Sequence, residues 1–280
     1  MPVEAAETYR AAGRLDEAIP LFVQALADAK DLLGAGHPGT LLIQSNLAAA
    51  YLEAEDFGRA VDLNERTLAG RIKVLGPRHQ DTLTSYNNLA SSYQAAGRLA
   101  DAIPMFGAAL ADSRRILGAD HPGSLTLTHN LAGAHRDLGD LETAITLYEQ
   151  NLVDRRRVLS SGHPDIGESQ NSLAETYQEA GRLDEAIALF RCAVDATEEA
   201  DGPAHPRVLT YRNNLATAYA DHDRLEAAVA LLADALRRAQ QALGTDHPVT
   251  ELIRRNLATA SAKSKPKSGT GTGIAAEPLF

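Results

Sequence analysis

A step of forty-two residues recurs along the chain with no insertion or deletion. Its clearest markers are six equally spaced histidines, namely His37, His79, His121, His163, His205 and His247. The tripeptide Asn-Leu-Ala keeps the same step, beginning at residues 46, 88, 130, 214 and 256. A period of this length is typical of a stack of similar supersecondary units, so the repeat constrains the fold more than any other feature.

Each unit carries the apolar spacing of two helices. Leu47, Ala48 and Tyr51 share one helical face. Thr40, a hydroxyl residue near the start of the first helix of its unit, is expected to cap that helix. The proline after most of the histidines stops the preceding helix. We predict thirteen helices: first helices that begin near residues 3, 40, 82, 124, 166, 208 and 250, and second helices over 14–33, 56–75, 98–117, 140–159, 182–201 and 224–243.

One helix pair cannot bury its own apolar face, whereas stacked pairs bury the faces of their neighbours. We therefore expect an all-α, right-handed superhelical solenoid with a concave and a convex side. It spans residues 1–262 as six 42-residue units, with a half-repeat at the start and a capping helix at 250–262. The half-repeat either caps the array or marks an array cut from a larger protein. Residues 263–280 are rich in Lys, Gly, Ser and Thr, and we expect a disordered tail there.

A few residues depart from the regular pattern. Asn64 stands where the other second helices carry Phe, Tyr or Leu, which predicts looser packing in the second repeat. Pro20 and Pro104 fall inside predicted helices, where a loosened first turn or a slight kink is expected. Cys192, the single cysteine, lies beside two apolar residues and is expected to be buried.

Charge and motif content narrow the classes of function. The formal net charge is −10, and the last eighteen residues contribute +2, so the array itself carries −12. That balance disfavours nucleic-acid binding, which needs a basic surface. No apolar run approaches the ~20 residues that cross a membrane, and the start lacks a secretory signal, so we expect a cytoplasmic protein. The absence of a phosphate-binding loop, a zinc-protease motif and a nucleophile elbow predicts no enzyme and no cofactor.

The six phased histidines could suggest a metal site, but their spacing argues against one. The ligands of one metal ion lie ~2.0–2.1 Å from it, whereas equivalent positions in successive repeats should be on the order of 10 Å apart. We expect each histidine to fasten its own loop, by donating to carbonyl groups at the end of the preceding helix.

The order Asn-Leu-Ala, then Tyr, then Gly-Arg-Leu-Asp-Glu-Ala-Ile, then Phe resembles the tetratricopeptide repeat. The usual repeat has ~34 residues. The forty-two-residue unit, with its longer second helix and its His-Pro loop, resembles the kinesin-light-chain type, which bacteria also use in long arrays. The resemblance covers about residues 3–262. It implies helical hairpins and a role in binding proteins or peptides.

The asparagines of the first helices are the candidate binding residues. Asn46 lies about 100° round the helix from Leu47, where the buried stripe meets the concave surface. In related repeats asparagines at this place contribute to peptide binding, and the resemblance marks Asn46, Asn88, Asn130, Asn214 and Asn256, with Asn87, Asn171 and Asn213 one position earlier. The alternative is that these amides bond a neighbouring helix and fix the repeat geometry; the two roles can coexist.

The sequence therefore predicts a scaffold for protein–protein interaction that holds an extended peptide or partner segment in its concave groove. Arg254 and Arg255 would suit a partner with an acidic end. The alternative function is a regulatory or self-associating sensor segment of a larger signalling or transcription-regulator system. We expect a monomer or weak self-association, and neither nucleic acid nor a membrane as partner.

Overall fold

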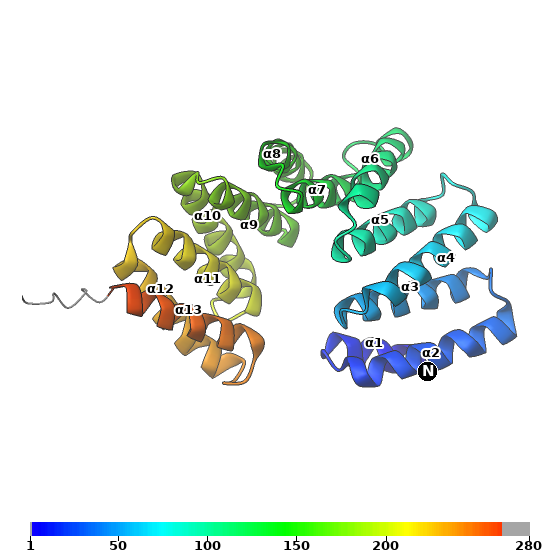
Figure 1. Cartoon of the computed structure of the whole chain (residues 1–280), viewed down its shortest axis with the longest axis horizontal. Coiled ribbons are helices and arrows are strands. Elements are labelled where there is room, and N and C mark those ends of the chain that lie inside the picture. Colours follow the sequence, from blue (N-terminus) through cyan, green and yellow to red (C-terminus); the bar gives the residue numbers. More distant parts are fainter. Residues whose placement is uncertain (1, 265–280) are drawn as a thin grey trace, which may run out of the picture. The chain divides into compact units, whose positions relative to one another are not determined.

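The computed structural model describes residues 2–264, which form thirteen α-helices and no strands (Figure 1). The helices are α1 (Pro2–Ala11), α2 (Leu15–Leu33), α3 (Pro38–Glu53), α4 (Phe57–Leu75), α5 (Gln80–Ala95), α6 (Leu99–Ile116), α7 (Pro122–Asp137), α8 (Leu141–Val158), α9 (Pro164–Glu179), α10 (Leu183–Asp201), α11 (Pro206–Asp221), α12 (Leu225–Ala242) and α13 (Pro248–Ser264). This confirms the expected all-α solenoid of helical repeats. No helix in this part of the chain combines the length and apolar character that crossing a membrane requires.

The chain divides into two compact units, residues 1–161 with α1 to α8 and residues 162–280, whose described part holds α9 to α13. Within each unit every helix packs on the next one along the chain. The odd-numbered helices of successive repeats also touch: α3 with α5 and α5 with α7 in the first unit, and α9 with α11 and α11 with α13 in the second. Successive even-numbered helices contact each other less, so the odd-numbered helices form the more closely spaced inner face of each unit.

Alanine at two recurring positions allows the helices to pack closely. Ala48, Ala90 and their equivalents on the first helices up to α11 have no exposed surface, and the same holds for Ala60, Ala102 and their equivalents on the second helices. Large side chains fill the space between these contacts, with Phe22 completely buried. The helix spacing therefore depends on a small residue at the same place in every repeat.

The loop between repeats is closed by two side chains whose roles are the reverse of those expected. Thr40 does not cap the first helix; its Oγ1 donates to the Gly34 carbonyl at the end of α2, 2.9 Å away. His37 is the residue that caps α3, because its Nδ1 accepts from the Gly39 N–H at 3.1 Å. The same Nδ1 bond recurs at all six histidines. The six first helices that follow a histidine consequently begin two residues earlier than predicted, directly after that histidine.

Two further expectations fail because the side chains find different surroundings. Asn64 does not loosen the second repeat: it is 2 % exposed, and its Nδ2 donates to Ser92 Oγ at 2.8 Å. Cys192 is exposed rather than buried, since it lies on the outer side of α10 beside the buried Ala193.

The helices α2 and α6 continue without interruption through Pro20 and Pro104.

The last described helix runs past residue 262. Helix α13 extends to Ser264, two residues beyond the predicted end of the array. The predicted tail lies outside the described residues from position 265 onward.

The turn inside each repeat requires a residue with positive φ. Gly13, Gly97, Gly139 and Gly181 fill this position with φ between 71° and 84°. In the remaining two repeats the position is held by Glu55, at φ 58°, and Asp223, at φ 56°. A side chain in this left-handed region costs roughly 1 kcal/mol, which glycine avoids because it has no Cβ.

Replacement of His121 by alanine tests the helix cap. The Gly123 N–H loses its acceptor, so we expect the free energy of unfolding to fall by about 1 kcal/mol. Urea denaturation measures the change. His121→Asn keeps a capping acceptor and should restore most of the loss; equal stability of the alanine variant and the parent would contradict the assigned role.

Replacement of Glu55 by glycine tests the strained turn. Removal of the Cβ relieves the left-handed conformation, and we expect a gain of about 0.5–1 kcal/mol in the free energy of unfolding. The reverse change, Gly97→Ala, should cost a similar amount. Thermal and urea unfolding of both variants provide the measurement, and a loss of stability in Glu55→Gly would refute the argument.

Candidate functional site

The candidate amides lie on the odd-numbered helices that form the inner face of each unit. In the first unit they are Asn46 on α3, Asn87 and Asn88 on α5, and Asn130 on α7. In the second unit they are Asn171 on α9, Asn213 and Asn214 on α11, and Asn256 on α13. The structure therefore distributes the predicted site residues over both units, and each group is described within its own unit.

The asparagines bind one another across successive repeats. Asn130 Nδ2 donates to Asn87 Oδ1 at 2.8 Å, and Asn88 Nδ2 donates to Ser45 Oγ at 3.2 Å. The second unit repeats this pattern, with Asn214 bound to Asn171 Oδ1 at 3.1 Å and Asn256 to Asn213 Oδ1 at 2.8 Å. Each of these four bonds joins residues 43 apart, whereas Asn46 Nδ2 donates to Glu7 Oε1 on α1 at 2.9 Å. One amide N–H of each of these asparagines thus helps to hold neighbouring first helices together.

Part of each of three amides in the first unit makes no hydrogen bond within the described part of the protein. An asparagine side chain carries two N–H donors and an acceptor oxygen, and an inter-repeat bond uses only one of these groups. Among the described residues, Asn87 makes no bond through its Nδ2, and Asn88 and Asn130 make none through their Oδ1. These three residues are half-buried. The first unit thus combines a scaffold role with unused polar groups on its inner face.

The second unit offers fewer of these groups. Asn171 and Asn213, which were expected in the groove, are only 9 % and 3 % exposed. Asn171 and Asn214 both donate to Glu175 Oε1, at 2.8 and 3.0 Å. The amides here are largely consumed by internal bonds.

The two arginines predicted for an acidic partner differ in their contacts. Arg254 pairs with Glu251 and donates to the Thr245 carbonyl at 3.0 Å, so it is attached to the loop before α13. Arg255 is exposed on α13. The structure does not combine them into one cationic cluster.

His129 occupies the same row as Asn87, one repeat later. Its ring packs edge-on against Tyr148, with centroids 5.1 Å apart. Burial, together with the positive charges of Arg155 and Arg136, lowers the pKa of His129 to about 3. The imidazole is therefore neutral in the folded protein at physiological pH.

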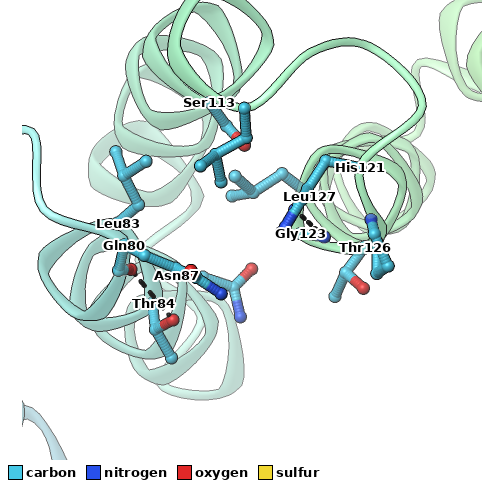
Figure 2. A pocket seen from close by; sticks show the side chains of 11 residues that line it. Gln80, Leu83, Thr84, Asn87, Ser113, His121, Gly123, Thr126 and Leu127 are labelled. Atoms are coloured by element: carbon cyan, nitrogen blue, oxygen red, sulfur yellow. Dashed lines mark hydrogen bonds between the residues drawn. The ribbon is translucent and has the colours of Figure 1, made fainter.

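A pocket of about 380 Å³ opens beside Asn87, and no sequence signal predicted it. Figure 2 shows it between α5 and α7, with Ser113 of α6 contributing to the lining. The lining residues are Gln80, Leu83, Thr84, Asn87, Ser113, Leu117, His121, Pro122, Gly123, Thr126 and Leu127. None is an Asp, Glu, Lys or Arg. The pocket thus places a leucine-rich interior next to an amide of the inner face.

The pKa of His129 predicts a pH dependence of stability. The ordinary pKa of histidine is about 6.5. Below that pH the His129 side chain is therefore protonated in the unfolded chain but stays neutral in the folded one. Stability should therefore fall as the pH drops from about 6.5 toward 3, by roughly 2 kcal/mol at pH 5. Urea denaturation at pH 7 and pH 5 measures the loss. His129→Asn, which matches Asn87 one repeat earlier, should remove this part of the pH dependence; an unchanged dependence would contradict it.

Comparisons with known proteins agree with the repeat geometry. The tetratricopeptide repeat model matches residues 2–73, 65–111, 81–152, 125–199 and 165–241. A crystal structure of nearly identical tetratricopeptide-like repeats from a Podosopora anserina protein of the kinesin-light-chain type is 30 % identical, with a TM-score of 0.64, covering 73 % of this chain and 97 % of that one. No curated protein matches the chain significantly.

Two more distant structures share the fold. BtubC (BKLC) from P. vanneervenii is 22 % identical with a TM-score of 0.68, and the match covers 84 % of this chain and 94 % of that one. A Rap protein complexed with Competence and Sporulation Factor is 14 % identical with a TM-score of 0.65, covering 94 % and 74 %. With 42-residue helix pairs in phase and a family model that matches most of its length, the chain belongs to the tetratricopeptide repeat family, in its kinesin-light-chain-like form.

Proposed function

We propose that the inner face of the first unit binds an extended segment of a partner protein. Tetratricopeptide arrays serve as scaffolds for protein–protein interaction, and the chain is such a scaffold at that level. The finer proposal is supported by one observation: the half-buried amides of Asn87, Asn88 and Asn130 keep unused donors or acceptors after their inter-repeat bonds are made.

The chemistry of these amides suits a peptide backbone. An extended segment presents N–H and C=O groups that need partners when they leave water. A row of amides supplies both kinds of partner without a demand for particular side chains. Recognition of this kind is independent of the segment's sequence, and selectivity must come from neighbouring residues that differ between repeats.

Small residues beside the amides leave space for such a segment. Three positions after the Asn-Leu-Ala asparagine, the first unit carries Ala49, Ser91 and Gly133. At Gly133 an added Cβ would lie 3.2 Å from the Tyr148 hydroxyl, so a side chain there would crowd the surface. The second unit has Glu175, Thr217 and Thr259 at the same positions, and Glu175 already accepts from two asparagines. The first unit is therefore the better binding face.

A bulky charge on the inner face tests the proposal. Ser91 forms no side-chain bond among residues 2–264 and lies at the centre of this face on α5. Ser91→Arg should block an extended segment, and we expect at least a tenfold loss of partner recovery in affinity capture followed by mass spectrometry. The matched control is Ala108→Arg, which places the same side chain on an exposed position of α6.

Measurements of stability and of molecular mass distinguish the possible outcomes of this experiment. Both variants should retain the far-UV circular dichroism and melting temperature of the parent. Partners captured equally by the parent and by Ser91→Arg would exclude the inner face as their binding surface. If the chain instead captures only itself, and light scattering shows a mass that rises with concentration, the self-associating alternative would replace this proposal.

A further inference from the structure

The pocket beside Asn87 belongs to a joint that recurs along the array. Each joint combines the last turn of a second helix with the first turns of the first helices on either side of it. The joint of α3, α4 and α5 encloses about 390 Å³, and the joint of α9, α10 and α11 about 10 Å³. The joints are built from equivalent positions of the repeat, so their side chains can be compared position by position.

The joint of α3, α4 and α5 contains an arginine side chain of the protein itself. Arg71 holds the position of Ser113 and is buried, and its Nη1 donates to the Asp81 carbonyl at 2.8 Å and to Ser85 Oγ at 2.9 Å. Asp81 also lines this cavity. This joint is therefore charged and partly occupied from within.

The joint in the second unit is closed by an ion pair. Arg207 Nη2 lies 2.6 Å from Asp201 Oδ2. These residues hold the positions of Gly123 and Leu117, so a charged pair crosses the space that is open between α5 and α7. Among these three joints, the one at Ser113 is the only one that is both open and free of charged lining residues.

Several polar groups inside the open pocket already have partners within the protein. Ser113 Oγ bonds Ser124 Oγ at 2.7 Å, and Ser124 Oγ in turn donates to the Gly118 carbonyl. The Nδ1 of His121 accepts from the Gly123 N–H. The apolar lining consists mainly of Leu83, Leu117 and Leu127, and the uncharged side chains of Gln80, Asn87 and Thr126 also line the pocket. A charged side chain placed there would lose its hydration with no counter-charge in return, whereas an apolar one would lose only unfavourable contact with water.

We propose that this pocket holds one large, uncharged apolar side chain of the bound segment, such as leucine, methionine or phenylalanine. The inference rests on the proposed function and names its specificity determinant. Asn87 connects the inner face of the first unit with the pocket, because this residue of the inner face also lines the pocket (Figure 2). Its Oδ1 accepts from Asn130, which leaves its amide N–H groups to donate to the backbone carbonyl of the residue whose side chain fills the pocket.

The pocket can be probed without knowledge of the partner. N-acetyl-leucine methylamide carries the required side chain between two peptide groups. Titrated into protein with labelled leucine methyl groups, it should shift the NMR signals of Leu83, Leu117 and Leu127 in a saturable way. The alanine analogue should bind at least tenfold more weakly, because it buries three fewer carbon atoms. The lysine and glutamate analogues should give no saturable shift at these methyl groups.

A transplant from the neighbouring joint should close the pocket while preserving the fold. Ser113→Arg combined with Leu127→Ser recreates the Arg71 and Ser85 arrangement, so the new guanidinium has both its acceptors. This variant should melt close to the parent and lose the response to the leucine probe at Leu83 and Leu117. The matched control makes the opposite exchange one repeat earlier, Arg71→Ser with Ser85→Leu, and should retain that response.

Any of three results would refute the pocket proposal: no saturable response to the leucine probe, binding of the lysine probe as tight as that of the leucine probe, or an unchanged response to the leucine probe in the folded transplant variant. These results are independent of the Ser91→Arg experiment. If the pocket binds the probe but the Ser91→Arg variant still captures all partners, only the groove function is refuted. If Ser91→Arg blocks capture but the partners bind the transplant variant as well as they bind the parent, only the pocket proposal is refuted.

Discussion

The structure depends on close contact between helices at alanine. At two positions in every complete repeat an alanine with no exposed surface, such as Ala90 on a first helix and Ala102 on a second, lets neighbouring backbones approach. A stack of helix pairs has no central core to compensate for a poor joint, because each repeat touches only its neighbours. A larger side chain at these positions would overpack the joint, at a typical cost of 1–3 kcal/mol. The closeness of the helices also determines which polar side chains can reach across a joint.

Short polar side chains satisfy the groups that this packing buries. In each loop a histidine supplies the acceptor for the new helix, and in most loops a threonine or serine donates to the carbonyl that ends the old one. Deeper in the joints, Asn64 donates to Ser92 and Asn151 to the Leu125 carbonyl. Such bonds avoid the free-energy cost of leaving a buried donor or acceptor unpaired. Polar residues at the joints are thus compatible with tight packing, and they fix the register of one repeat on the next.

The sequence predicted the helices well, because a period of forty-two residues leaves little choice of architecture. It was less reliable where the direction of a side chain decides the outcome. His37 and Thr40 were both expected at helix ends, but which of them serves which helix depends on the path of the loop between them. Asn64 was judged by its polarity alone, although its partner Ser92 lies twenty-eight residues away. Cys192 was judged by its sequence neighbours, but adjacent residues of a helix face different directions.

The candidate site shows the same division between what recurs and what varies. The recurring asparagines could be found by eye, yet the structure uses part of every amide for the scaffold, as Asn130 does with Asn87. A residue present in every repeat is subject first to the needs of every repeat. The pocket arises instead from the absence of residues present elsewhere, since Ser113 and Gly123 replace the Arg71 and Asp81 of the preceding joint. In a chain whose units share one backbone, the positions where one repeat lacks a side chain that its neighbours carry are the places where a partner's side chain can be received.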